Sequence, residues 1–67
     1  MSIEEKKQRY ISQVHNETRN RGISSEEIPV VINKTGFMSV MEKYPEEKMH
    51  DDISDTVDDI LAIASAR

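Results

Sequence analysis

The stretch DDISDTVDDI, residues 51–60, concentrates the side chains that could do chemistry. It holds five aspartates, and His50 comes directly before it. Carboxylates and an imidazole are ligands for divalent metal ions, so one interpretation of this stretch is a metal site. The other interpretation is the solvent-exposed side of an amphipathic helix.

Helical geometry favours the second interpretation. At about 100° per residue, the apolar residues of this segment gather on one side and the aspartates on the opposite side. A calcium loop of the EF-hand type needs a central glycine and a terminal glutamate, and the stretch has neither. His50 with Asp51, Asp55 or Asp59 would make at best a weak site for a divalent ion. We therefore expect no metal and no cofactor.

The same aspartates predict a charged surface on a rigid helix. Such a surface suits a basic protein partner, because opposite charges steer association and favour specific pairing. The residues of this predicted partner-binding face are Asp51, Asp52, Asp55, Asp58 and Asp59.

No catalytic constellation accompanies the acidic segment. The two histidines, His15 and His50, show no spacing pattern with a serine nucleophile. With Gly22 and Gly36 as the only glycines, the chain has no glycine-rich phosphate loop. We expect no catalytic residues and no enzyme activity.

The size and charge of the chain restrict its partners. Its 67 residues form one domain, and a domain of this size buries only about 60 % of the surface that its unfolded chain exposes. Because there is no cysteine for a disulfide, a protein partner or a homodimer would supply the missing burial. The net charge of −4 disfavours nucleic acid and anionic lipid. A charged N-terminal segment and short apolar runs predict neither a signal peptide nor a membrane span, so the expected location is cytoplasmic.

Helix signals divide the chain into short segments. Ser2 and Glu5 form a capping-box pattern that predicts a first helix ending at Gly22. Its expected inward residues are Ile3, Tyr10, Ile11 and Val14, with the Lys7 stem along the core and the last turn polar all round. A second helix, capped by Ser24 or Ser25, is expected to run to about Lys34, with Ile28, Val31 and Ile32 facing inward.

The second half of the chain continues in the same way. Gly36 ends the second helix, and residues 37–44 predict a short third helix that Pro45 breaks or kinks. Asp51 or Asp52 caps the last helix. Its inward residues are expected to be Ile53, Val57, Ile60, Leu61 and Ala64. The prediction is an all-α, compact bundle of three to four short helices joined by tight turns.

Two other parts of the chain indicate a binding surface. Val30 falls outside the inward stripe of its helix, which indicates a patch for a partner or for a second copy of the chain. The helices on either side of Gly36 also have the scale of a helix-turn-helix, so a DNA-binding regulator is the alternative function. Against it, the expected recognition helix carries one lysine and no Arg, Asn or Gln to read bases.

The segment ISSEEIPVVINKTGFMSVMEKY resembles a family of small bacterial proteins of unknown function. That family shows a Ser-x-x-Glu opening, an Asn-Lys-x-Gly turn and a short helix ending in Tyr. The matching residues here are Ile23, Ser24, Glu27, Ile28, Ile32, Asn33, Lys34, Gly36, Met41 and Tyr44. Met49-His50 and Asp59-Ile60 resemble two later pairs, so the likeness spans about residues 10–63, whereas Pro29 and Pro45 depart from the pattern.

The resemblance implies a role but no catalytic residues. Members of that family are often encoded beside an ADP-ribosyltransferase-like protein, which implies an accessory or neutralising partner. The sequence thus predicts a small acidic module for protein–protein interaction, regulatory or antitoxin-like, whose partner is a neighbouring toxin-like enzyme or a second copy of the chain.

Overall fold

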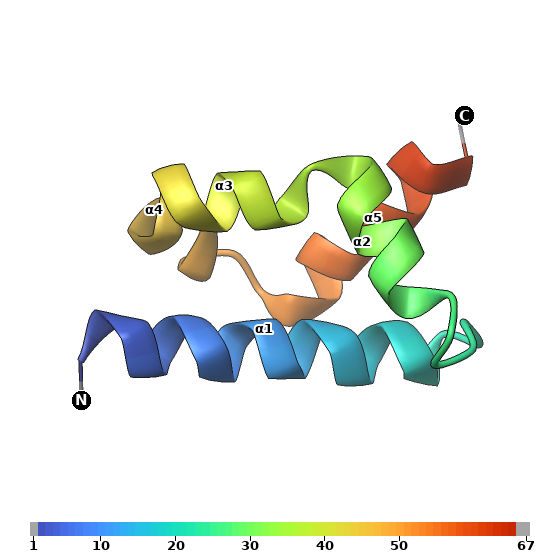
Figure 1. Ribbon diagram of the computed structural model, residues 1–67, viewed down its shortest axis with the longest axis horizontal. Coiled ribbons are helices and arrows are strands. Elements are labelled where there is room, and N and C mark those ends of the chain that lie inside the picture. The colour runs from blue at the N-terminus through green and yellow to red at the C-terminus, as the bar shows by residue number, and fades with distance from the viewer. Residues whose placement is uncertain (1, 66–67) are drawn as a thin grey trace.

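Five α-helices account for most of residues 2–65, the part of the chain that the computed structural model describes (Figure 1). They are α1 (Ile3–Asn20), α2 (Ile28–Thr35), α3 (Phe37–Lys43), α4 (Pro45–Met49) and α5 (Ile53–Ser65). No strand occurs in this part of the chain. The predicted all-α class is confirmed, whereas the expected number of three to four helices is wrong.

The additional helix is α4, and Pro45 explains it. Pro45 occupies the first turn of α4, where its fixed φ suits the helix and its missing N–H has no intrahelical acceptor. The Lys48 N–H donates to the Tyr44 carbonyl at 3.1 Å and closes the first turn. Pro45 therefore ends α3 and also begins a new helix.

The start of α1 follows the predicted capping pattern. The Ser2 hydroxyl accepts a hydrogen bond from the Glu5 N–H at 3.3 Å, and α1 ends just before Arg21 and Gly22. Lys7 is buried along its stem and its ammonium reaches Glu4 at 3.4 Å. Ile3, however, is 40 % exposed, so its expected inward position is wrong. The first turn of α1 lies beside α4, where a surface depression next to Ile3 leaves it partly uncovered.

The start of α2 differs from the prediction. The helix begins at Ile28 with Glu27 as N-cap and no side-chain capping bond, so neither Ser24 nor Ser25 caps it. Instead, the Ser24 carbonyl accepts the N–H groups of Glu27 and Ile28 at 3.0 and 3.1 Å and forms a turn. A helix starting at Ser25 would require an N–H at Pro29, which proline lacks.

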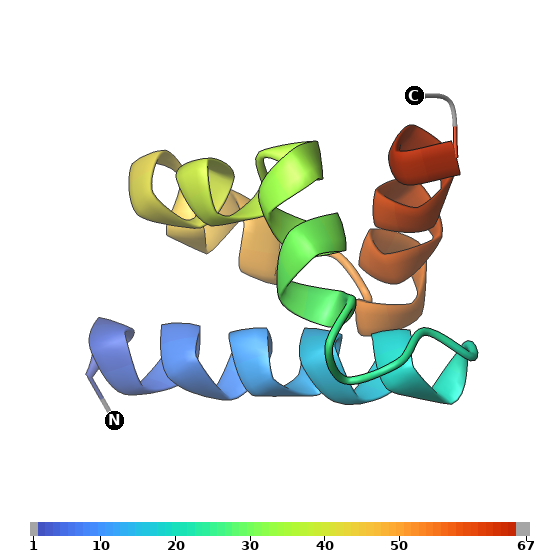
Figure 2. The ribbon, with the colours of Figure 1, turned by 45° about the vertical axis from the view of Figure 1, so that its right-hand side comes forward.

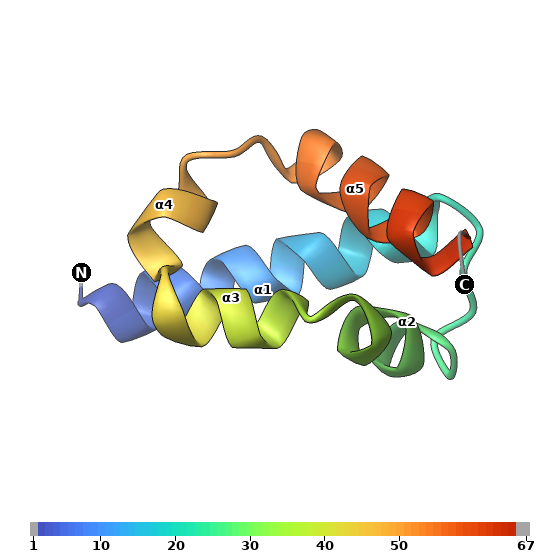
Figure 3. The same ribbon diagram turned by 90° about the horizontal axis from the view of Figure 1, so that it is seen from above.

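The helices enclose one apolar core. α1 lies along one side of the molecule, and the α2–α3 and α4–α5 segments lie over it, with α3 roughly parallel to α1 and α2 and α5 crossing it (Figures 2 and 3). Seen from above, α3 and the α4–α5 segment lie on opposite sides of the α1 axis (Figure 3). The buried apolar residues are Tyr10, Val14, Ile28, Ile32, Phe37, Met41, Val57 and Ile60. Those of α1, α2 and α5 had been predicted to face inward.

Two threonines complete the core. Thr18 and Thr56 are fully buried. Thr18, in the C-terminal part of α1 that was expected to be polar all round, donates its hydroxyl to the Val14 carbonyl at 2.7 Å. This bond removes the cost of burying a free hydroxyl, which is why a polar residue can lie in the core.

Candidate functional site

The five aspartates of residues 51–59 lie on the surface. All five are exposed, while Val57 and Ile60 of the same segment are buried. The prediction that the aspartates face solvent and the apolar residues fix the orientation of α5 is confirmed. Asp52 directly precedes α5, and its carbonyl accepts the Thr56 N–H at 3.0 Å, so it occupies the N-cap position.

Two of the aspartates contribute to the fold itself. Asp58 accepts a hydrogen bond from Arg21, whose other nitrogens donate to Glu17 at 2.8 Å and to Ser54 at 3.0 Å. The bonds to Asp58 and then Glu17 raise the pKa of the Arg21 guanidinium. Asp51 accepts from the Lys48 ammonium at 3.4 Å. Asp58 is thus paired with the C-cap residue of α1, and Asp51 with a residue of α4.

The other three form what we call the acidic stripe: Asp52, Asp55 and Asp59. Their spacings of three and four residues place them along one side of α5. Within residues 2–65 their carboxylates make no ion pair. No group of three or more His, Cys, Asp or Glu in the described part of the chain could hold a metal ion. Among the residues that the structure describes, the stripe is therefore a set of unpaired charges facing solvent.

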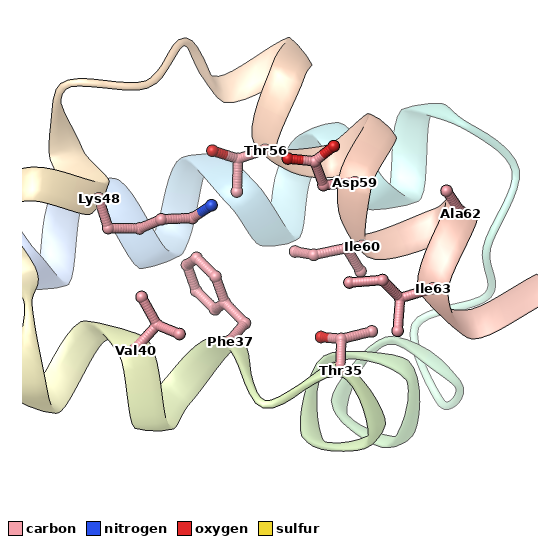
Figure 4. A pocket seen from close by; sticks show the side chains of 9 residues that line it. All are labelled: Thr35, Phe37, Val40, Lys48, Thr56, Asp59, Ile60, Ala62 and Ile63. Carbon is pink, nitrogen blue, oxygen red and sulfur yellow. The ribbon is translucent and has the colours of Figure 1, made fainter.

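A groove adjoins the acidic stripe, with a volume of about 230 Å³. We call it the α3–α5 groove. Figure 4 shows Phe37 from α3 and Ile60 from α5 pointing toward each other within it, with Val40 on the α3 side and Ile63 on the α5 side. Thr56 and Asp59 lie on the upper side of this view, and the Lys48 side chain reaches in from the left. Its lining is completed by Thr35 and Ala62.

A second hollow continues the groove along α3. It has a volume of about 310 Å³ and is lined by Val40, Tyr44, Glu47, Lys48 and Asp51. Val40 and Lys48 line both hollows, so the two adjoin at these side chains, and together we call them the depression from Ile63 to Tyr44. Three apolar side chains along it are partly exposed: Ile63 by 40 %, Val40 by 38 % and Tyr44 by 57 %.

The sequence did not predict this groove, and only some of its lining residues could have been recognised from the sequence. Ile63 sits at the edge of the inward side of α5, and Asp59 follows from the helical wheel. Val40, Tyr44 and Lys48 come from segments whose position relative to α5 depends on α4, which was not predicted. Val30 is 60 % exposed on α2, as expected, but it does not line the groove.

The helix-turn-helix alternative can be compared with the surface of α3. α2 and α3 meet directly at Gly36, whose φ is +74°. Phe37 and Met41 face the core, and the exposed side chains of α3 include Met38, Val40 and Lys43. The exposed polar side chains of α3 are Ser39, Glu42 and Lys43, with no Arg, Asn or Gln among them, so its surface does not favour DNA recognition.

Comparisons with protein-family models, with curated protein sequences and with solved structures find no match to this chain. Within residues 2–65, none of the helices has the length and apolar character needed to cross a membrane.

Proposed function

We propose that this chain is a small cytoplasmic regulatory module that binds a basic surface of a protein partner through the acidic stripe. The observation that carries the proposal is the state of Asp52, Asp55 and Asp59. They remain without ion pairs among the described residues, although Asp51 and Asp58 beside them are paired.

Repulsion between the carboxylates of the stripe lowers the stability of the isolated chain. Like charges three or four residues apart on a helix destabilise it by about 0.2–0.5 kcal/mol per pair. The positive end of the helix dipole offsets the repulsion for the carboxylates of Asp52 and Asp55. Asp59 lies beyond the first turn, where the effect of the dipole fades. A basic partner would relieve this repulsion, which supports a role in binding.

The proposed antitoxin-like role comes from the family resemblance. It makes a neighbouring toxin-like enzyme the first partner to test. A homodimer through the acidic stripe is disfavoured because a two-fold contact would place like charges opposite each other. A homodimer through another surface remains a separate outcome that sedimentation would reveal.

The test is a comparison of affinity capture by matched variants. The variant Asp52→Asn/Asp55→Asn/Asp59→Asn removes the charge of the stripe, and Glu5→Gln/Glu26→Gln/Glu42→Gln removes three exposed carboxylates elsewhere. We expect the native chain and the control to retain the same partner, and the stripe variant to lose it. Equal capture by all three proteins, with similar melting temperatures, would reject the acidic stripe as the binding surface.

A further inference from the structure

The α3–α5 groove and its continuation have the size of a side-chain site. Cofactor and ligand pockets usually measure about 300–1,000 Å³ and enclose their ligand. The groove measures about 230 Å³ and the hollow beside it about 310 Å³, so volume alone does not exclude a small ligand, but both are open to solvent. An elongated, open depression of this kind suits a few consecutive side chains of a peptide segment better than a compact small molecule.

The apolar part of the depression is already formed. Phe37 and Ile60 are each 3 % exposed and belong to the core, so the floor of the groove is rigid. Val40 and Ile63 stand above this floor on opposite sides and are each more than a third exposed. Apolar side chains placed along the groove between them would cover part of each, and this burial would favour binding.

The charged residues of the depression favour a partner of positive charge. Three carboxylates, Glu47, Asp51 and Asp59, and one ammonium, Lys48, line it, which leaves a formal charge of −2. Lys48 is already occupied by Asp51 at 3.4 Å. Glu47 and Asp59 make no ion pair within residues 2–65; Asp59 lines the groove and Glu47 lines the hollow beside it.

We propose that this depression binds an amphipathic, basic peptide segment of a partner protein. The apolar side chains of the segment pack between Val40 and Ile63, and its lysines or arginines pair with Asp59, and through it with the rest of the acidic stripe, and with Glu47 in the adjoining hollow. The inference rests on the proposed function, and it adds where the partner docks and what its binding segment is made of.

A second copy of the chain does not meet these requirements. Two copies joined groove to groove would place one net negative surface against another. The basic residues of α1 do not supply the segment either, because the apolar residues of that helix, Tyr10 and Val14, are buried in the core.

The test is a titration of the isotopically labelled full chain with defined peptides, followed by amide chemical shifts. The probe is a leucine–lysine peptide of about 14 residues with helical periodicity. A leucine–glutamate peptide reverses its charge, and a serine–lysine peptide removes its apolar face. We expect saturable amide shifts at Val40, Asp59 and Ile63 with the leucine–lysine peptide. The serine–lysine peptide should bind at least about tenfold more weakly. The leucine–glutamate peptide should not bind.

Surface variants then locate the contact. We expect Val40→Thr and Ile63→Thr each to weaken binding of the leucine–lysine peptide by about fivefold or more, and Ile3→Thr, at an exposed position outside both hollows, to leave its affinity unchanged. All three positions are exposed, and thermal melting of each variant checks that its fold is intact. Sedimentation of the free chain, run in parallel, reports self-association.

The outcomes separate this inference from the proposed function. If Val40→Thr and Ile63→Thr bind like the native chain, or if the serine–lysine peptide binds equally well, the groove is not the docking site, although charge-based docking on the acidic stripe still stands. Binding of the leucine–glutamate peptide, or loss of a dimer in the two groove variants, also overturns the inference. Failure of the proposed function would appear separately, as equal capture of the partner by the acidic-stripe variant.

Discussion

The hydroxyl oxygens of Tyr10 and Thr56 lie 2.6 Å apart in the core and join the middle of α1 to the first turn of α5. The Tyr10 hydroxyl donates its proton to the Asp51 carbonyl at 3.0 Å, so Thr56 acts as the donor to Tyr10. The ring of Tyr10 stacks on Phe37 with centroids 6.4 Å apart. Tyr10 therefore holds α1, α3 and the start of α5 together, directly behind the α3–α5 groove that Thr56 and Phe37 help to line.

Replacing Tyr10 with phenylalanine should weaken the fold markedly. Tyr10→Phe keeps the ring but leaves the buried Thr56 hydroxyl without its tyrosine partner, a loss that typically costs about 1–3 kcal/mol. A domain of this size seldom has more than about 3–5 kcal/mol of stability, so this is a large fraction. Urea unfolding followed by circular dichroism measures the change.

Two further variants show whether the hydrogen bond is responsible. Tyr44→Phe is the control, because Tyr44 is 57 % exposed and its change should stay within about 0.5 kcal/mol. Thr56→Val added to Tyr10→Phe should cost less than the sum of the two single changes, since the orphaned hydroxyl is also removed. Strict additivity would show that the two hydroxyls do not interact.

The stability of the fold should fall at alkaline pH because of Tyr10. Burial raises the pKa of this phenol, the carboxylates of Asp51 and Asp52 raise it further, and the hydrogen bond with Thr56 opposes them. A raised pKa in the folded state means that the contribution of Tyr10 is fully present below its unfolded pKa of about 10 and is lost as the pH rises above it. Urea midpoints across this range should decrease more steeply for the native chain than for Tyr10→Phe. Parallel decreases in the two proteins would contradict this assignment.

Local signals in the sequence were enough to predict the bounds of most of the helices. The Ser2 cap, the glycine stops and the apolar period of residues 53–64 predicted α1, α3 and α5 closely. The start of α2 and the whole of α4 were missed because each depends on what a proline does at the beginning of a helix. Pro29 delays the start of α2, whereas Pro45 allows α4 to begin.

The candidate site was predictable only where it lies on one helix. The helical wheel placed the five aspartates in solvent because it needs no neighbour to do so. It could not separate Asp58 from Asp59, since their different roles depend on Arg21, which lies 37 residues earlier in the chain. The groove was not predictable either, because it needs the packing of α3 and α4 against α5.

The division between buried and exposed residues of α5 can be tested with a pair of alanine variants. Val57 is fully buried, so Val57→Ala removes core contacts and leaves a cavity, with an expected loss of about 1–3 kcal/mol. Ile63 is 40 % exposed at the groove, and Ile63→Ala should change the free energy of unfolding by no more than about 0.5 kcal/mol. Urea unfolding of both variants provides the comparison. A reversed order would show that α5 is rotated relative to this structure.

The junction between α2 and α3 depends on the backbone of Gly36. Its φ of +74° is unfavourable for residues with a Cβ, although a Cβ built there would meet no atom within 4 Å. Gly36→Ala should therefore cost about 1 kcal/mol from backbone conformation alone, and Gly36→Asn less, because asparagine tolerates this region better. Thermal melting of both variants checks the order. Equal losses would indicate that something other than the left-handed conformation limits this position.

Arg21 should stabilise the packing of α1 against α5 in a way that lysine cannot reproduce. Its guanidinium donates through separate nitrogens to Glu17, Ser54 and Asp58, whereas the single ammonium of a lysine lacks this fork geometry. Arg21→Lys should lower the melting temperature at low salt, and the difference from the native chain should shrink at about 1 M salt, where screening acts within about 3 Å. Arg19→Lys is the control, because Arg19 is exposed in the last turn of α1 and makes no ion pair within residues 2–65. If Arg21→Lys melts like the native chain at every salt concentration, the contact with Asp58 does not stabilise the fold, and Asp58 would then be as available to a partner as the acidic stripe.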